Sequence, residues 1–467
     1  MINNNISEKY KALFKNTGIF AISNFSSKVL IFLLVPLYTR VLSTEEYGFY
    51  DLVYTTIQLC FPILTLGISE AVMLFLLKND TNPTKIFTIS VKFLLIANIF
   101  FCGGLLVNHI FNFSHLTNKY TLYILSFFVF YCLENVLFQF AKGINAVSDM
   151  AIASVFGTIT MVALNIFFLL VFRLGLQGYF IANIIGYFVP CLYLIVKLKI
   201  WKYIELKIDK KLQHAMVTYA APLIVNTLGW WANNTSDRYI VTAICGVGSN
   251  GLISVAYKIP NIVSTISGIF IQAWQISVIN EKQKNKNSTF YADFFVHFNA
   301  LLCLMSSFLI LFDKPISKII FGNDFFNAWK YVPFLIISAL FNSASGYMGA
   351  ILAADMKSKA LADSAIAGIV TNISLNFILT IMMGPQGITI ATMIGSFIIY
   401  YGREHQSKGE IRSKSYKLIL ISWLLLIFMS VFLIYFSNYI IVGAMALAEI
   451  VIYKKSITTV LKKLKAK

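Results

Sequence analysis

Charged residues are scarce in this chain of 467 residues: Asp, Glu, Lys and Arg together make up only 12% of it, about half the share found in soluble domains. So little charge cannot cover the surface of a soluble protein, which excludes a secreted domain, a cytosolic enzyme and a disordered chain. Hydrophobic residues make up 58%, enough for roughly thirteen or fourteen apolar runs of about 20 residues each. The runs do not alternate with polar residues, which excludes a transmembrane β-barrel. We therefore predict an all-α polytopic membrane protein.

The chain also lacks the spacings that mark disulfide frameworks, metal sites and nucleotide sites. Its six cysteines stand singly, with no C-x-x-C pair, so we expect small apolar side chains and no disulfides. The five histidines show no ligand spacing, and no G-x-x-x-x-G-K-[ST] loop occurs. We therefore predict no metal and no cofactor, and a protein that is not an enzyme. The polar, basic start shows no cleavage site, so we expect the first apolar run to be retained.

Fourteen apolar runs are bounded by charged or turn residues, and they fall into groups of six, six and two. The runs lie at about 17–39, 49–77, 86–107, 121–140, 150–171, 178–196, 219–243, 251–275, 292–312, 331–354, 361–382, 385–402, 418–436 and 439–453. These groups predict an N-terminal six-helix bundle at 1–200 and a C-terminal six-helix bundle at 201–402. Two extra helices and a basic cytoplasmic tail follow at 403–467.

The net charge is +18, and the distribution of Lys and Arg along the chain indicates the membrane topology. With the N-terminus in the cytoplasm, Lys and Arg are about fourfold more abundant in the inside segments than in the outside segments, as the positive-inside rule requires. We therefore predict that both termini are cytoplasmic. The basic excess is then a topology signal, so we expect no nucleic-acid partner. The basic segments 197–211 and 454–467 are expected to contact anionic membrane lipid.

A weak internal repeat supports the two groups of six. EEYGFYDLVY at 45–54 aligns with GSNGLISVAY at 248–257, just after the first helix of each group, and the two share a glycine and a tyrosine. Because each half has an even number of helices, the two copies are parallel and related by an axis along the membrane normal. This is one of the two symmetries found among secondary transporters.

Polar residues inside the apolar runs are the candidates for function, because each costs roughly 2.5–3.5 kcal/mol near the bilayer centre unless it faces water or a partner. In the first run, Asn24 and Lys28 lie four residues apart and therefore on one helix face. They could form a wall of a central cavity, with Lys28 offering a cation to an anionic substrate. The structural alternative is that Lys28 snorkels or pairs with a carboxylate.

The seventh run repeats this polar pattern in the second half. It contains Asn226 and Asn233 and continues into Asp237 and Arg238. The last two are either part of the cavity or an interface pair near the outer leaflet. Lys258, just before a proline, either binds a phosphate or anchors the inner edge of its helix.

The acidic residues in the runs are candidate ion-coupling sites. Asp51, Glu70 and Glu134 lie in the first half, and Asp237 lies in the second. A carboxylate in a partly wet cavity can be tuned to bind and release a proton, or it can bind sodium. For the three in the first half, the alternative is that each neutralises a neighbouring lysine, and we favour this alternative. For Asp237 the alternative is the interface pair with Arg238.

Two segments carry a family resemblance. Residues 36–76, PLYTRVLSTEEYGFYDLVYTTIQLCFPILTLGISEAVMLFL, resemble the hallmark segment of Wzx-type polysaccharide-export flippases, which belong to the multidrug/oligosaccharidyl-lipid/polysaccharide superfamily. SDRYIVTAICGVGSNGLISVAYKIP at 236–260 resembles the other recurring segment of that family. The resemblance implies two six-helix bundles that alternate between inward-open and outward-open states in the bacterial inner membrane.

The implied cargo is an undecaprenyl-diphosphate-linked oligosaccharide, the repeat unit of an O-antigen or a capsule, moved from the cytoplasmic to the outer leaflet. By the same likeness, the cations Lys28, Arg40, Arg238 and Lys258 are the candidates to engage the diphosphate. A polysaccharide polymerase and chain-length machinery are the expected partners. Coupling to protons, coupling to sodium and pulling by polymerisation outside all stay open.

Three other functions compete with this one. A drug or organic-cation exporter of the same superfamily would show a carboxylate-rich pocket. A membrane enzyme of glycan assembly would need a larger outer platform than the short outer loops provide. A non-transporting scaffold would recruit the assembly machinery without moving lipid.

Overall fold

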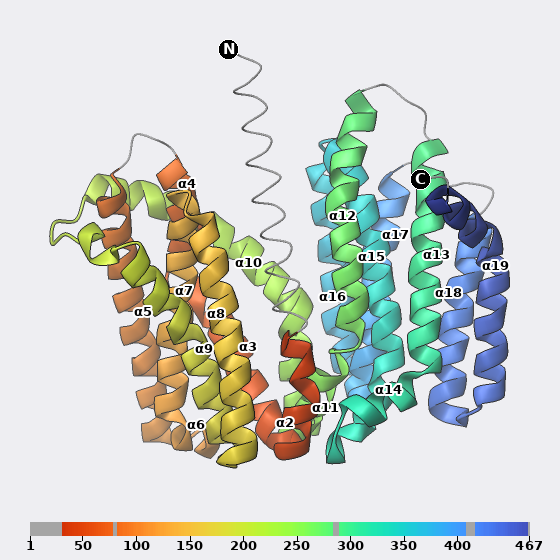
Figure 1. Cartoon of the computed structure of the whole chain (residues 1–467), viewed down its shortest axis with the longest axis horizontal. Helices are drawn as coiled ribbons and strands as arrows, with labels where there is room; N and C mark the ends of the chain where they lie inside the picture. Colours follow the sequence, from red (N-terminus) through yellow and green to blue (C-terminus); the bar gives the residue numbers. More distant parts are fainter. Residues whose placement is uncertain (1–29, 78–81, 284–288, 408–415, 466–467) are drawn as a thin grey trace. The chain divides into compact units, whose positions relative to one another are not determined.

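The computed structural model describes residues 30–77, 82–283, 289–407 and 416–465, and every regular element in these ranges is helical (Figure 1). The all-α fold predicted from the sequence is confirmed. The chain divides into two compact units, the first ending at Asn234 and the second beginning at Thr235. The boundary lies inside one helix, α10 (Lys210–Cys245). The predicted three-part division at 200 and 402 stays a prediction.

The first unit holds the helices up to the first part of α10. They are α2 (Val35–Val41), α3 (Thr44–Leu64), α4 (Ile68–Leu77), α5 (Pro83–Phe111), α6 (His115–Lys119), α7 (Thr121–Gly143), α8 (Val147–Ile166), the π-helical turn η1 (Phe167–Val171), α9 (Gly175–Lys197) and the 3₁₀ turn η2 (Ile200–Tyr203). Helix α9 packs against α7 and α8, and α4 packs against α7.

The second unit continues from the end of α10. It contains α11 (Val247–Ala256), α12 (Pro260–Gln283), α13 (Thr289–Leu311), α14 (Asp313–Ile320), the 3₁₀ segment η3 (Asn323–Tyr331), α15 (Val332–Ala354), α16 (Ser358–Met383), α17 (Pro385–Gln406), α18 (Tyr416–Val431), the π-helical turn η4 (Phe432–Phe436) and α19 (Tyr439–Lys465). Helix α15 buries most of its side chains and packs against α12, α13 and α17, while α13 also contacts α18 and α19.

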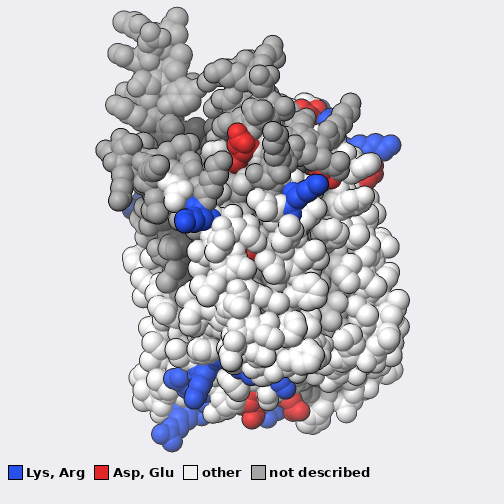
Figure 2. Space-filling model, turned by 90° about the vertical axis from the view of Figure 1, so that its right-hand side faces the viewer, with Lys and Arg blue, Asp and Glu red and all other residues white. Residues whose placement is uncertain are grey.

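Eight of the described helices are long and apolar enough to cross a membrane, and the number rises to ten when each of two bent pairs counts as one span. The predicted count of fourteen is therefore not confirmed. The surface fits a membrane setting: Figure 2 shows a face on which charged side chains gather at the two ends and leave the middle nearly uncharged.

The two bent pairs occupy equivalent places in the two units. Helices α3 and α4 meet at 58° within the run that the sequence predicts as continuous at 49–77. Leu66 and Gly67 have φ values of 51° and 64° there, a backbone conformation that ends a helix and that glycine adopts without strain. Helices α11 and α12 meet at 45°, and α12 begins at Pro260, which has no amide proton to continue the preceding helix.

Glycines bring a second pair of helices close together in each unit. In the first unit, a Cβ on Gly157 of α8 would lie 2.7 Å from the carbonyl oxygen of Gly186 on α9. In the second unit, a Cβ on Gly368 of α16 would lie 3.0 Å from the carbonyl oxygen of Gly395 on α17. Small residues let membrane helices approach at backbone distance. Helices that come late in each unit are thus packed by the same device, as a parallel repeat would produce.

Candidate functional site

Tyrosine rings gather where α2, α3 and α9 meet in the first unit. The rings of Tyr38 and Tyr47 stack with their centroids 4.7 Å apart, and Tyr179 meets Tyr50 edge to face at 4.5 Å. We call these four residues the tyrosine cluster. Asp51, only 9% exposed, lies next to it, close enough to interact electrostatically with three of the rings. The predicted coupling residue Asp51 is therefore buried among phenol groups.

The start of α3 explains why these rings converge. Ser43 caps the helix in a reciprocal arrangement: its hydroxyl accepts a bond from the amide of Glu46 at 3.1 Å, and Glu46 Oε2 accepts one from the amide of Ser43 at 2.9 Å. This capping box sets where α3 begins and so places Tyr47 and Tyr50, three residues apart, on one helix face. Arg40, at the end of α2, is exposed.

The two other predicted carboxylates of the first unit differ from each other in setting. Glu134 of α7 is half-buried beside Tyr187 and Cys191. Glu70 is exposed at the start of α4 and interacts electrostatically with Lys142 at the end of α7. The arrangement around Glu70 therefore resembles charge neutralisation, whereas Glu134 lies among aromatic and thiol groups.

In the second unit, the end of α10 is joined to α11 by polar contacts. The hydroxyl of Tyr257 donates a hydrogen bond to Asp237 Oδ2, and the guanidinium of Arg238 donates to the hydroxyl of Ser254. The Arg238 guanidinium carbon also lies 5.4 Å from the centre of the Tyr257 ring, within range of a cation–π contact. We call these residues, with the fully buried Asn250 one turn before Ser254, the Asp237–Tyr257 node.

The remaining predicted residues are placed as follows. Asn233 is half-buried one turn before Asp237 in α10, and Lys258 is half-buried in the turn between α11 and α12. Asn24 and Lys28 lie outside the described residues, and so does the side chain of Asn226. Of the predicted residues of the second half, the structure therefore places Asp237 and Arg238 in one set of contacts with α11.

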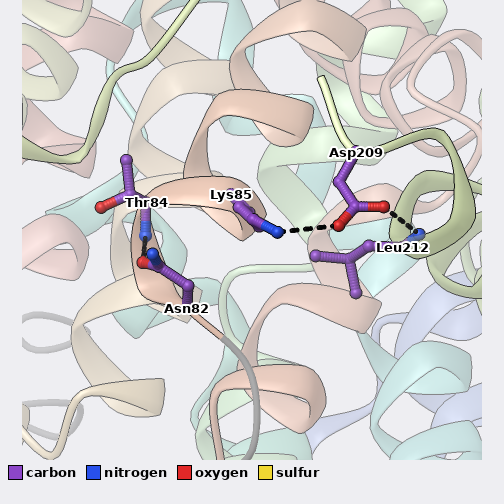
Figure 3. A network of polar contacts seen from close by, with 5 residues as sticks. All are labelled: Asn82, Thr84, Lys85, Asp209 and Leu212. Atoms are coloured by element: carbon purple, nitrogen blue, oxygen red, sulfur yellow. Dashed lines mark hydrogen bonds and ion pairs between the residues drawn. The ribbon is translucent and has the colours of Figure 1, made fainter. Parts of the chain in front are cut away.

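An ion pair ties the segment before α10 to the start of α5 (Figure 3). Lys85 Nζ lies 3.0 Å from Asp209 Oδ2, and Asp209 Oδ1 accepts the amide hydrogen of Leu212 at 3.1 Å. Asn82 caps α5 by accepting the amide hydrogen of Thr84. The amide of Leu212, followed by the ammonium of Lys85, lowers the pKa of the Asp209 carboxyl. Both charged side chains are partly exposed, so the pair orients the segment more than it stabilises the fold.

A cavity of about 530 Å³ opens close to this pair in the first unit. Lys92 Nζ donates to Gln213 Oε1 at 2.9 Å across it, and Lys210 and His214 also line it. Its other walls are apolar. Of the polar residues that line the cavity, only Lys92 lies in a predicted span. The others fall in or beside the basic segment 197–211, and folding brings them close to Lys92.

Two charged groups inside the helix packing of the second unit, the half-buried Arg403 and the buried Glu449, are not among the predicted site residues. Arg403 falls in the interval after the predicted run 385–402, but α17 continues to Gln406. Its guanidinium lies inside the second unit, where it donates to the carbonyl oxygen of Ser345 at 2.9 Å and contacts Ser364 Oγ at 3.4 Å. Glu449 lies within the last predicted run, and that position alone is a signal that could have marked it.

Among the described residues, no group of three or more His, Cys, Asp and Glu side chains is arranged to hold a metal ion. All six cysteines are free thiols.

Comparison with solved structures identifies the fold. The structure of a lipid II flippase, MurJ, in an inward-closed conformation matches with a TM-score of 0.71 at 17% identity, covering 95% of this chain and 99% of the flippase. An inward-facing multidrug resistance transporter of the MATE family, in the MOP superfamily, matches with a TM-score of 0.64 at 14% identity, covering 84% of this chain and 99% of the transporter. The chain is therefore a multi-pass membrane protein with the fold of these transporters.

Comparison of the sequence with curated proteins gives no match. The sequence profile of a family described as "Polysaccharide biosynthesis protein" matches residues 13–279, which is more than half of the chain. The resemblance seen in the two hallmark segments is thereby confirmed. The chain belongs to this polysaccharide biosynthesis family.

Proposed function

We propose that this protein is a flippase that moves an undecaprenyl-diphosphate-linked oligosaccharide from the cytoplasmic to the outer leaflet by alternating access. The observation that carries the proposal is the fold: a lipid II flippase matches nearly end to end, and the family is one of polysaccharide biosynthesis. The proposed cargo is the repeat unit of an O-antigen or capsule, which makes the protein a component of lipopolysaccharide or capsule biosynthesis. It acts as a transporter and not as an enzyme.

The cargo explains why such a protein is needed. A diphosphate and a polar glycan cannot cross about 30 Å of hydrocarbon unaided, because burying unpaired charges costs tens of kcal/mol in the Born limit. A flippase lowers this barrier by giving the headgroup a polar path while the polyprenyl tail stays in lipid. We therefore assign the diphosphate to cations on that path, with Lys28, Arg40, Arg238 and Lys258 as the candidates, and the glycan to Asn24, Asn226 and Asn233.

Arg238 is the candidate that the contacts support best. Ser254 and the face of Tyr257 orient its guanidinium. A guanidinium held in this way can donate two parallel hydrogen bonds to phosphate oxygens, a geometry that a lysine cannot reproduce.

For coupling, we propose Asp51, Glu134 and Asp237 as the carboxyl groups that respond to protons or sodium. Their burial or half-burial beside phenol groups supports this role. Glu70 differs, because it is exposed and beside Lys142, and we assign it to charge neutralisation. The proposed setting is the bacterial inner membrane with both termini cytoplasmic, beside a polysaccharide polymerase and its chain-length partner.

The test is the sidedness of the lipid-linked oligosaccharide in proteoliposomes with and without the protein, repeated under an imposed proton or sodium gradient. We expect glycan to appear on the far leaflet only when the protein is present. Arg238→Ala should slow this transfer by about tenfold or more, because hydrogen bonds to a charged group contribute about 1.5–3 kcal/mol. Arg173→Ala, which changes an exposed arginine in the loop before α9, is the matched control and should transfer normally.

A second candidate function is the export of organic cations. The tyrosine cluster beside Asp51 favours it, because aromatic faces and a carboxylate together attract a cation, and the fold match to a multidrug transporter agrees. Transfer of an organic cation by well-inserted protein that leaves the glycolipid in place would replace the flippase proposal with this one. Transfer of neither would refute both.

A further inference from the structure

Three helices of the second unit enclose a carboxyl group that the proposed transport path does not use. Helix α19 packs against α13 and α18, and α13 also packs against α18 (Figure 1). Glu449 lies near the middle of α19, and its exposed fraction is 0%. The carboxyl group is therefore inside the three-helix contact and does not face lipid or headgroups.

Neither oxygen of Glu449 has a hydrogen-bond partner among the described residues. Ser422 of α18 lies next to the carboxyl group, and its own hydroxyl is buried and unpartnered in the same part of the structure. On the α13 side lies Cys303, whose thiol receives a weak hydrogen bond from the hydroxyl of Tyr453 at 3.7 Å. The indole N–H of Trp423, close to Cys303, also has no described partner. We call these five residues the Glu449 cluster.

The charges of the groups around Glu449 determine whether its carboxyl group is protonated. The titratable groups that face it are the thiol of Cys303 from α13 and the phenol of Tyr453 from α19 itself, and α18 contributes only Ser422 and Trp423. No member of the cluster carries a positive charge. An ionised carboxylate in this setting would lack a counter-ion, and its two oxygens accept no hydrogen bond from the described residues, so its burial would cost several kcal/mol or more. A proton on one oxygen removes the charge and supplies a donor.

The neighbours also distinguish a proton from a metal cation. Hard cations such as sodium need several oxygen ligands, and besides Glu449 the cluster offers only the hydroxyls of Ser422 and Tyr453. The indole N–H of Trp423 can only donate, so it supplies no ligand to a cation, and a thiol is a poor ligand for a hard ion.

We propose that Glu449 is a proton-binding site. The proton is held while α19 packs against α13 and α18, and it is released when these helices part enough for water to reach the carboxyl group. The proposal adds a site on helices other than those of the proposed coupling residues, and it does not depend on the identity of the cargo. Binding of the proton and packing of the three helices are then thermodynamically coupled, so that each favours the other.

Infrared spectroscopy of the full-length protein in lipid nanodiscs tests the site directly. We expect a carboxylic-acid carbonyl band at neutral pH that disappears in Glu449→Gln and shifts in Glu449→Asp, which keeps the acid. Glu45→Gln, at an exposed position in the first turn of α3, is the matched control and should leave the band unchanged. Because Glu449→Asp assigns the band independently, the test stands even when the glutamine variant does not fold.

Amide hydrogen exchange of residues 439–453 then tests the link to packing. The glutamine side chain mimics the protonated acid, so exchange in wild type should become faster than in Glu449→Gln as the pH is raised, and the two should converge as it is lowered. A carboxylate band for Glu449 at neutral pH would overturn the proposal. So would equal exchange in the two proteins at every pH, or a difference that follows the sodium concentration at fixed pH.

Discussion

At the scale of single residues, the buried carboxyl groups of this protein are accommodated in different ways. Asp237 accepts a hydrogen bond from a phenol in the Asp237–Tyr257 node. Asp313, at the start of α14 and outside the membrane spans, is 0% exposed, and its Oδ1 accepts a bond from Ser317 at 3.1 Å while Oδ2 has no described partner. Burial raises the pKa of the Asp313 carboxyl well above its ordinary value, against the smaller effects of Ser317 and Lys314.

The raised pKa of Asp313 predicts a dependence of stability on pH. The folded protein binds this proton more tightly than the unfolded chain does, so Asp313 lowers stability progressively as the pH rises above the unfolded pKa of about 4. Asp313→Asn keeps the acceptor for Ser317 and cannot ionise. We expect it to raise the melting temperature by a few degrees at pH 7, with the gain shrinking towards pH 4, as measured by thermal unfolding in detergent.

The control for this prediction is Asp324→Asn, at an exposed position in the neighbouring segment η3. It should change the melting temperature little at either pH. If Asp313→Asn is instead less stable than wild type at both values, then Asp313 acts as a needed carboxylate and not as a buried acid.

At the scale of elements, two devices shape the helices: breaks that bend a span and glycines that bring two spans together. The pair α16–α17 is the closest case, since a Cβ on Gly368 would lie 2.1 Å from Ile399 Cγ1 as well as near the backbone of α17. A side chain there forces the two helices apart.

This contact predicts that Gly368→Ala destabilises the second unit by about 1–3 kcal/mol, the usual cost of overpacking. Gly443→Ala in α19 is the matched control, because a Cβ there meets nothing within 4 Å. Relative to glycine, alanine in a helix interior gains about 0.5–1 kcal/mol, so the control should be neutral or stabilising. Denaturant unfolding of both variants checks this, and equal effects would show that the glycine contact is unimportant.

At the scale of the whole molecule, two units built in the same order carry the proposed function. Both contain a bent second span and a later pair of helices packed through glycines. From a parallel repeat of this kind we expect the start of both units to lie on the same side of the membrane. The distribution of lysine and arginine predicts that this side is cytoplasmic.

Cysteine labelling tests this orientation. In a background without the six native cysteines, Lys207→Cys, before α10, should react with an impermeant maleimide only after the cells are permeabilised. Asp324→Cys, between α14 and α15, should react in intact cells. Both positions are exposed, so access depends on the side of the membrane alone. The reverse pattern would invert the proposed topology and the direction of transport with it.

The sequence by itself determined the helical class, the membrane setting and the family. Run length, scarcity of charge and short motifs are local properties, and a bilayer acts on each helix separately, so they can be evaluated without knowing the fold. The same local signals predicted Asp51, Asp237 and Arg238 as buried or half-buried polar residues. They did not resolve the break at Leu66 and Gly67, because a hydrophobic run continues across it.

Only the tertiary structure decided which polar groups meet. Arg403 becomes an internal cation because α17 extends past its apolar run and packs against α15 and α16. Glu449 becomes a buried carboxyl group without a counter-ion because α13 and α18 surround it with groups that cannot neutralise a charge. Contacts between helices more than a hundred residues apart depend on how whole faces pack, and no local pattern in the chain encodes that choice.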